Sequence, residues 1–386
     1  MILSPQHPLA AGLTHDSRLV RATRGLRSDT LPVWFMRQAG RSLPEYRELR
    51  VGTRMLDACL DPAMAAEITL QPVRRHGVDA GIFFSDIVVP LKLVGVDVEI
   101  QPGRGPVFGR AYADAAAVAE LTAIDPARLD ETVAPVAEAV SRTTAALADL
   151  TAPGAPTSTP LIGFAGAPFT LAAYLAEGGP SKDHLAARTL MHADPGAWRA
   201  LMDWTAELTG RFLRAQVLAG ASAAQLFDSW AGALSLADYR EHVAAASAAA
   251  LAHVHDLAYD AVDADADADA DGVAQRHSVP VIHFGVGTGE LLGAMKTDVV
   301  DVVGVDYRVP LDVAAGRVGD GVPLQGNLDP ALLPAPWPVL EAAVRDVVSR
   351  GRAAPAHVFN LGHGVPPETD PTVLTRVVEL VHEAGR

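Results

Sequence analysis

Cysteine is almost absent from this chain of 386 residues, which contains only Cys59. A single thiol excludes an internal disulfide and any zinc or iron–sulfur site built from several cysteines. It also fits a reducing compartment, and we expect a cytoplasmic protein. Residues 1–27 lack the basic start and continuous apolar core of a secretory signal, although four arginines in this stretch leave an organelle-targeting leader as the alternative.

Long apolar runs and positive charge are scarce as well. No uninterrupted apolar stretch approaches the roughly 18 residues that a membrane helix requires. The 31 lysines and arginines are outnumbered by 46 aspartates and glutamates, which gives a net charge of −15. Because nucleic-acid binding depends on concentrated basic residues, we expect neither a nucleic-acid nor a membrane partner.

Arginines nevertheless gather directly after the hydrophobic run 32–36. Arg37 and Arg41 flank Gln38, Ala39 and Gly40, and they are followed by Arg47, Arg50 and Arg54. Arginine stays charged at working pH, and its planar fork of donors matches carboxylates and phosphates. In an otherwise acidic chain this turn predicts a local receptor for a small polyanionic ligand.

Short apolar runs alternate with longer helical patterns along the whole chain. Eight runs are expected to be strands: 32–36, 80–85, 160–165, 224–228, 280–284, 302–305, 323–326 and 357–361. Five intervening stretches carry apolar residues at helical spacing: 61–77, 126–148, 195–219, 236–257 and 371–384. Repeated strand–helix units predict an α/β fold, a single (β/α)₈ TIM-type barrel over residues 30–386 behind an arm at 1–29, with its active site at the carboxyl ends of the strands.

One segment departs from this regular pattern. The alternating aspartates and alanines of 263–271 have no apolar periodicity and repel one another, so we expect a flexible acidic insertion over 260–272. A calcium loop is the alternative, but the run lacks the glycine turn and terminal glutamate of an EF-hand. A second loop, rich in Pro, Ser and Thr, is expected at 152–160.

Polar residues follow several of the predicted strands. Asp86 ends the run that begins at residue 80, among large apolar neighbours, so its carboxylate should be poorly hydrated and held by N–H donors or a cation. A loop-capping aspartate is the alternative. The glycines and alanines within 163–167 precede Pro168 at a predicted helix start, where free amides favour an anion. Tyr174 follows within that helix, either at the rim or packed in the core.

Two further strand ends carry reactive residue types. Ser229 lacks the G-x-S-x-G elbow of a nucleophile, which favours a hydrogen-bonding role. His363 lies between Gly362 and Gly364 and is expected at the barrel mouth as an anion donor or proton shuttle, and it has no neighbouring metal ligands. The glycines at 285–289 lack the trailing acid of a dinucleotide fingerprint and indicate a turn.

At these residues the chain resembles the uroporphyrinogen decarboxylase family, over roughly residues 30–384. Two segments carry the resemblance: Pro32 to Arg41 with the Leu-Pro-Glu-Tyr of 43–46, and Gly163 to Thr170 running on through Tyr174 to Gly178. Three others follow in family order, at 303–306, 324–330 and 360–364.

The resemblance implies a (β/α)₈ barrel, usually a homodimer, that removes CO₂ from the four acetates of uroporphyrinogen III to give coproporphyrinogen III in haem synthesis, with no cofactor and no metal. It implies catalytic roles for Asp86 and Arg37. By match of motif it also implies substrate contacts for Arg37, Gln38, Ala39, Gly40, Arg41, Asp86, Tyr174, Ser229 and His363.

The chain departs from the family pattern at two positions near these motifs. Ser42 stands where a tyrosine is usual, and Trp230 stands where a histidine is common. Two other functions remain open: a corrinoid-dependent methyltransferase, which would need a His-x-Cys zinc pair that the chain lacks, and a tetrapyrrole carrier without catalysis.

Overall fold

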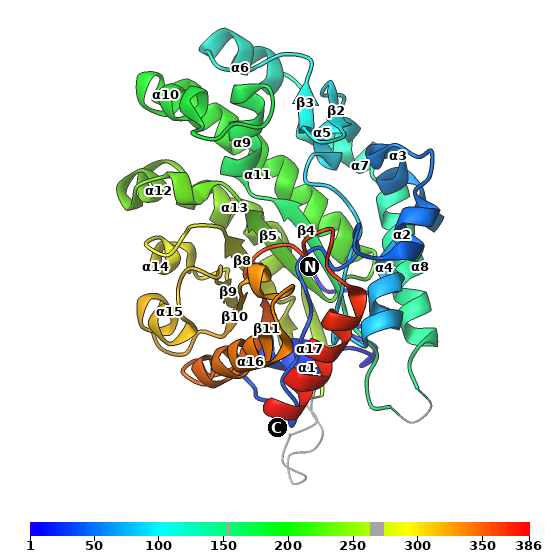
Figure 1. The fold of residues 1–386 in the computed structure, drawn as a ribbon. Coiled ribbons are helices and arrows are strands. Elements are labelled where there is room, and N and C mark those ends of the chain that lie inside the picture. The colour runs from blue at the N-terminus through cyan, green and yellow to red at the C-terminus, as the bar shows by residue number, and fades with distance from the viewer. Residues whose placement is uncertain (153–154, 263–273) are drawn as a thin grey trace.

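Seven parallel strands form one curled sheet at the centre of the molecule (Figure 1). The computed structural model describes residues 1–152, 155–262 and 274–386. The strands run across the sheet in the order β1 (Gly81–Ile82), β4 (Leu161–Gly166), β5 (Ala223–Asp228), β8 (Val281–Gly285), β9 (Val302–Gly304), β10 (Leu324–Leu328) and β11 (His357–Leu361). Every residue of β4, β8, β10 and β11 is buried, as expected where helices cover a parallel sheet.

Helices connect the strands and surround the sheet. The outer layer contains α4 (Pro62–His76), α8 (Ala134–Asp149), α11 (Pro195–Leu218), α13 (Ala244–His255), α14 (Leu292–Met295), α15 (Leu311–Val318), α16 (Trp337–Gly351) and α17 (Pro371–Ala384). Shorter helices lie in the loops: α2 (Pro44–Leu49), α3 (Met55–Leu60), α5 (Val89–Leu93), α6 (Ala115–Thr122), α7 (Leu129–Thr132), α9 (Pro168–Glu177), α10 (Leu185–Ala193) and α12 (Leu236–His242), with 3-10 turns at Pro126–Arg128, Ala231–Ala233 and Pro330–Leu332. Within the described ranges, no helix combines the length and apolar character needed to cross a bilayer.

Capping residues fix where several of these helices begin. Asp61, Asp194 and Asp370 each precede a proline at the first helical position and accept a backbone N–H from the first turn. A cap of this kind stabilises a helix by about 1 kcal/mol. The predicted helices at 61–77, 195–219 and 371–384 are confirmed within a residue or two, because these start signals are written in the sequence.

The two other predicted helices are divided. The stretch 126–148 contains a 3-10 turn, α7 and α8, and the stretch 236–257 breaks at Val243, whose backbone leaves the helical region at φ −130°. No proline or glycine marks the second break, so spacing alone gave one helix where two lie end to end.

The first predicted strand, 32–36, is not formed as a strand. Its ladder is a single parallel bridge between Val33 and Phe359, although Asp79 also donates its backbone N–H to the carbonyl of Val33 at 2.8 Å. The amides of Phe35 and Met36 bond instead to side chains, the first to Gln38 and the second to Asn360. Side-chain oxygens therefore accept the amides that a neighbouring strand would bind in a regular sheet. Closure into an eight-stranded barrel stays a prediction.

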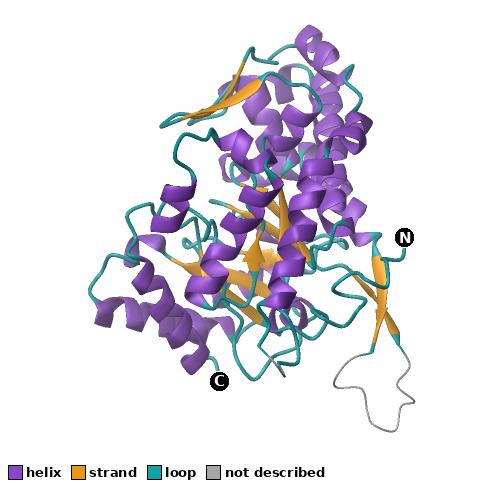
Figure 2. Cartoon of the chain, turned by 90° about the vertical axis from the view of Figure 1, so that its right-hand side faces the viewer, coloured by secondary structure: helices purple, strands orange, loops and turns teal. Residues whose placement is uncertain are grey.

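Two antiparallel hairpins, absent from the predicted strands, lie at opposite ends of the molecule (Figure 2). One joins β2 (Val98–Gln101) to β3 (Gly105–Phe108) beyond the carboxyl end of β1. The other joins β6 (Ala258–Ala261) to β7 (Gln275–Ser278) before β8. The acidic run 263–271 falls between these last strands and lies outside the described residues. The loop expected at 152–160 contains no helix or strand in its described part.

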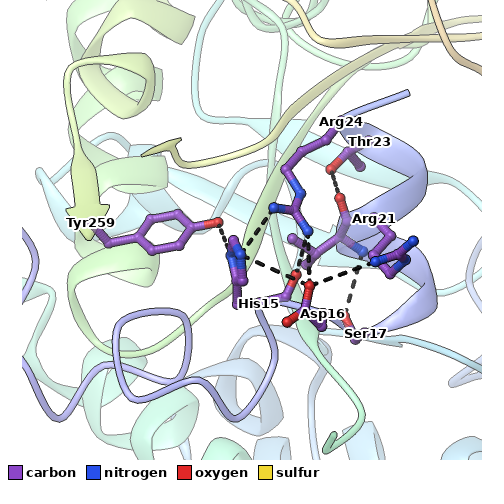
Figure 3. A network of polar contacts seen from close by, with 8 residues as sticks. His15, Asp16, Ser17, Arg21, Thr23, Arg24 and Tyr259 are labelled. Carbon is purple, nitrogen blue, oxygen red and sulfur yellow. Dashed lines mark hydrogen bonds and ion pairs between the residues drawn. The ribbon is translucent and has the colours of Figure 1, made fainter. Parts of the chain in front are cut away.

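The segment before residue 30 packs on the β6–β7 hairpin and carries α1 (Arg18–Thr23) (Figure 3). His15 lies 3.0 Å from the hydroxyl of Tyr259, and Arg24 lies 3.0 Å from the other ring nitrogen of the same histidine. Arg24 also donates to Asp16 at 3.2 Å, and Ser17 caps the helix. The buried contact between His15 and Tyr259 therefore fastens this segment to the β6–β7 hairpin.

Candidate functional site

The candidate site is built on the turn that follows the bridge at Val33. Arg37 adopts a left-handed backbone conformation (φ 50°), which costs a non-glycine residue about 1–3 kcal/mol and is enriched at functional sites. The side chains of Arg37 and Arg41 are exposed, and within the described residues neither forms an ion pair with a carboxylate. Two guanidinium groups are therefore available to an anion.

Gln38 is completely buried and braces this turn. Its carbonyl oxygen accepts the amide of Phe35 at 3.0 Å, and its NH₂ group donates to the carbonyl of Ala80 at 2.9 Å. Both ends of the side chain are thus occupied by the protein. Gly40 lies against the same turn, because a Cβ added there would stand 3.2 Å from the carbonyl oxygen of Arg37.

Asp86 follows β1 and faces this turn. One of its oxygens accepts the amide of Val88 at 3.1 Å. Burial raises the pKa of Asp86, while the amides of Val88 and Ile87 and the charge of Arg37 act in the opposite direction. The side chain retains some solvent exposure, and no described cation forms a salt bridge with it. Asp86 is therefore a carboxylate whose charge is only partly compensated.

An aromatic stack forms the next wall. The ring of Tyr174 in α9 lies on Trp230 with centroids 3.8 Å apart, and His184 lies on the opposite side of the stack, 4.3 Å from Trp230. Burial and the charge of Asp86 raise the pKa of Tyr174 to about 12, so its phenol stays protonated. Like Arg37, His184 has a left-handed backbone conformation, with φ 51°. Spacing in the sequence gave no sign of this stack.

Ser229 lies between the buried Asp228 and Trp230 and is half exposed. Its loop is held by Thr170, whose hydroxyl donates to Asp228 at 3.0 Å and accepts the amide of Trp230 at 3.4 Å. Thr170, in the first turn of α9, thus holds the end of β5 in place. His283 approaches the second oxygen of Asp228 at 3.8 Å, and the sequence did not bring these two residues together.

His363 follows β11 and is exposed beside Arg37. The protein around its ring lowers the pKa of His363, and the charges of Arg37 and Arg308 lower it further, while Asp306 raises it. Gly364 packs on the arginine stem, since a Cβ added there would stand 3.2 Å from Cδ of Arg37. Asp306 is buried and is paired with Arg308. A neutral imidazole at neutral pH is the consequence.

Two of the remaining arginines of the cluster face other partners. Arg54 pairs with Asp57 at 2.8 Å, and Arg50 donates to the carbonyl of Thr53 at 3.1 Å. Arg47 is exposed on α2, and its side chain has no partner among the described residues. The basic patch expected from five arginines is therefore reduced to three free side chains, those of Arg37, Arg41 and Arg47.

Cys59 does not join the site as a ligand. Its thiol is buried in α3, and burial together with the charge of Asp86 raises its pKa. The chain has no second cysteine to bind a metal with it. A thiol held protonated is a poor nucleophile and a poor metal ligand.

A separate cavity of about 400 Å³ lies at the other end of the sheet. Its lining comes from the segments that precede the strands, including Arg27, Pro32, Ala356 and His357. None of the sequence-predicted site residues lines it. The ligand-binding features expected from the sequence thus gather at the carboxyl ends of the strands, as in barrel enzymes generally.

Electrostatic coupling indicates that these side chains lie close together. The charge of Arg37 acts on Asp86, Tyr174 and His363, and the charge of Asp86 acts on Tyr174. The arrangement combines exposed cations, a poorly compensated carboxylate and an aromatic wall. It suits a ligand that carries carboxylates at its edge and N–H groups or positive charge at its centre.

Comparison with known proteins gives a consistent result. The family model for uroporphyrinogen decarboxylase matches residues 14–384. A protein of Leifsonia xyli named uroporphyrinogen decarboxylase is 71% identical over 98% of both chains, and one of Arthrobacter sp. is 60% identical over 96% of this chain and 98% of its own. Among solved structures, a methyltransferase from Methanosarcina mazei has a TM-score of 0.71 at 17% identity, covering 95% of this chain and 97% of that one, a similarity of fold alone.

Proposed function

This chain belongs to the uroporphyrinogen decarboxylase family, a family of carboxy-lyases, and from that premise we propose how the side chains at its strand ends divide the reaction. The proposed substrate is uroporphyrinogen III, whose four acetates become methyl groups. The observation that carries this proposal is the pair of exposed guanidinium groups of Arg37 and Arg41, which have no ion-pair partner among the described residues, beside the poorly compensated carboxylate of Asp86.

The reaction uses the pyrrole as its own electron sink. A proton adds to a ring carbon next to the acetate and makes the ring cationic. The bond to the carboxylate then breaks, CO₂ leaves, and the bonding electrons neutralise the ring as an exocyclic double bond. A second proton reaches the exocyclic carbon, the ring proton departs, and a methyl group remains. Overall, the conversion of each acetate to a methyl group consumes one proton and releases one CO₂.

Asp86 stabilises the charge that develops in this sequence. Its carboxylate accepts the pyrrole N–H groups and faces the ring as the ring becomes cationic. Because the protein compensates the negative charge of Asp86 only partly, its attraction remains available to the substrate. This charge attracts the cationic ring more strongly than the neutral ring. That difference is what lowers the barrier.

Arg37 and Arg41 bind and orient the acetates and propionates of the substrate. The charge of Arg37 acts on both Asp86 and His363, which supports a catalytic role for Arg37 in orienting the acetate that reacts. An arginine guanidinium is in general a reluctant proton donor, so the proton source is assigned to solvent.

The neighbouring residues have supporting roles. Gln38 holds the turn, and Ala39 and Gly40 leave room for the substrate beside it, as the bonds of Gln38 to the backbone support. Tyr174 contacts the substrate edge with a protonated phenol. Ser229 and His363 complete the rim from neighbouring loops.

Three further features are proposed with this function. The segment around Val33 closes the sheet into an eight-stranded barrel within a single catalytic domain, residues 30–386, behind the arm 1–29. Hydrogen bonds from Phe359 to Pro32 and from Asp79 to Val33 support the closure. The family resemblance supports a homodimer, and the single cysteine supports a cytoplasmic location.

The test is anaerobic incubation of the purified protein with uroporphyrinogen III, followed by oxidation and chromatography that counts the remaining carboxylates. We expect loss of four carboxylates through seven-, six- and five-carboxylate intermediates. Tight binding of the substrate without any loss of CO₂ would contradict the proposal and favour a carrier. Methyl transfer is disfavoured by the buried thiol of Cys59, which has no His-x-Cys partner.

A further inference from the structure

Two helices outside the strand ends bring three metal-ligating side chains together. His192 lies in the last turn of α10, and Asp238 and His242 lie four residues apart in α12, so both point from one face of that helix. Figure 1 shows α10 and α12 on the same side of the molecule. One ligand atom from each of the three residues lies within 4.8 Å of the others.

We propose that His192, Asp238 and His242 bind a divalent transition metal ion, with Zn²⁺ as the best match. A tetrahedral zinc ion with two imidazoles and a carboxylate places neighbouring ligand atoms about 3.3 Å apart, given bonds of about 2.0–2.1 Å. Nε2 of His192 already lies 3.7 Å from Oδ1 of Asp238, so a small side-chain rotation brings both onto one ion.

The two imidazole rings also have suitable relative positions. Their centroids are 5.8 Å apart and their planes are nearly perpendicular, at 88°. Two imidazoles on one tetrahedral ion have centroids roughly 5 Å apart. Two nitrogen donors with one carboxylate favour zinc, copper or nickel over magnesium and calcium, which prefer oxygen. Solvent fills the fourth position, because His192 is more than half exposed.

An ordinary surface ion pair accounts for only part of this geometry. An ion pair between His192 and Asp238 explains their 3.7 Å separation, and His242 also lies 3.9 Å from Glu241. Neither pair explains why both imidazoles and Asp238 present ligand atoms within 4.8 Å of one another. A shared metal ion satisfies all three residues at once.

The protein holds the backbone that carries Asp238 and His242 in place before any ion binds. The hydroxyl of Ser235 accepts the amide of Asp238 at 3.1 Å, and the indole of Trp198 donates to the carbonyl of His242 at 3.2 Å. Trp198 is buried in α11. Both ends of α12 are thus anchored, so the backbone of this helix has little freedom to lose on binding.

The position of this site gives the metal a structural effect. α10 begins directly after His184, and α12 follows the loop that contains Trp230, so an ion joined to both helices links the two segments that meet in the aromatic stack. It stabilises the folded protein by binding it and not the unfolded chain. This effect is independent of the decarboxylation chemistry and of its proposed residues.

Isothermal titration of the chelator-treated, full-length protein with zinc chloride tests the site. Excess Mg²⁺ is included to suppress binding by carboxylates alone. We expect one saturable zinc per chain in the wild type and in a control variant, His255→Ala, which removes a histidine from α13 outside the cluster. Affinity should fall at least tenfold in His192→Ala and in Asp238→Asn.

A thermal readout separates loss of the site from loss of the fold. Without zinc, we expect all four proteins to have the same circular dichroism and nearly the same melting temperature. With zinc, the melting temperature should rise in the wild type and the control but not in the two cluster variants. Absence of saturable binding in the wild type, or equal affinity in the cluster variants, would overturn the proposal.

Discussion

Replacing Asp86 with asparagine removes one charge and almost no volume, so it isolates the electrostatic role of the carboxylate. The amide oxygen can still accept the backbone N–H of Val88, which keeps the loop in place. A unit charge about 4 Å from a cationic ring, at an effective dielectric constant of about 20, contributes about 4 kcal/mol. Partial exposure of Asp86 reduces that value. We therefore expect kcat to fall between about 100- and 1,000-fold.

The stability of the Asp86→Asn variant should change in the opposite direction. Burial raises the pKa of Asp86 in the folded state above that of an unfolded chain. Between those two pKa values the folded state binds more protons, so stability decreases as pH rises through that window and the deficit persists at neutral pH. The uncharged asparagine removes the deficit. The variant should be at least as stable as the wild type at neutral pH, as measured by urea unfolding.

The pH dependence of kcat/KM provides a second measurement. Because burial raises the pKa of Asp86, the acid limb of the wild-type profile should lie above the ordinary aspartate range, and it should disappear in the variant. Asp114→Asn serves as the matched control, since this exposed residue caps α6, is not one of the proposed site residues, and asparagine caps equally well. A kcat within about fivefold of wild type in a folded Asp86→Asn protein would refute the proposed role.

Three other substitutions test the surroundings. Gly364→Ala brings a methyl group to 3.2 Å from Cδ of Arg37, so KM should rise in steady-state kinetics while the melting temperature stays unchanged. Trp230→Ala removes the ring stacked 3.8 Å from Tyr174, and KM should rise more than kcat falls; Trp230→Phe should restore part of the loss if ring contact is the cause. Asp79→Ala removes the carboxylate that accepts the buried amide of Val33 at 2.8 Å and lies 2.7 Å from Nε2 of His382, so it should lower the unfolding free energy by about 2–3 kcal/mol in urea. A change below about 0.5 kcal/mol would contradict a stabilising role of this side chain.

Much of the fold was predictable because its signals are local. The buried strands of the sheet are continuous apolar runs, and the long outer helices begin at aspartate–proline caps. The β2–β3 hairpin also had a local signal, since Val98 and Ile100 alternate with polar residues before the glycines at 103 and 105. The hairpin has no continuous apolar run, so a prediction based on such runs does not include it.

The failure at residues 32–36 has a different cause. A run of apolar residues gives no information about which acceptors its amides will find. Gln38 lies three residues away and Asn360 lies 324 residues from Met36, so the side chains that replace the ladder come together only in the folded chain. Similarly, β6 and β7 are joined by an exposed ion pair between Asp260 and Arg276, and they lack the alternating apolar residues that would indicate strands.

The site was predictable to the extent that strand ends determine it. Asp86, Ser229 and His363 each follow a strand, and parallel strands deliver their carboxyl ends to the same edge. The aromatic stack could not be predicted in this way, because His184 lies between two helices and meets Trp230 only through packing. The same holds for His192, which reaches α12 from a helix more than 40 residues earlier.

Side chains within the arginine turn differ in their contacts: Arg37 and Arg41 are exposed, and Gln38 is bonded to the backbone. The left-handed backbone of Arg37 costs about 1–3 kcal/mol, and it persists only where neighbours over-determine it. Gln38 supplies that constraint through its two bonds to the backbone, and Val365 adds a third by donating its amide to the carbonyl of Met36 at 3.2 Å. Ser42, by contrast, is buried with a hydroxyl that has no partner among the described residues, so it adds no brace. Gln38, between the two arginines, therefore holds the turn, and in the proposed function the exposed guanidinium groups bind the substrate.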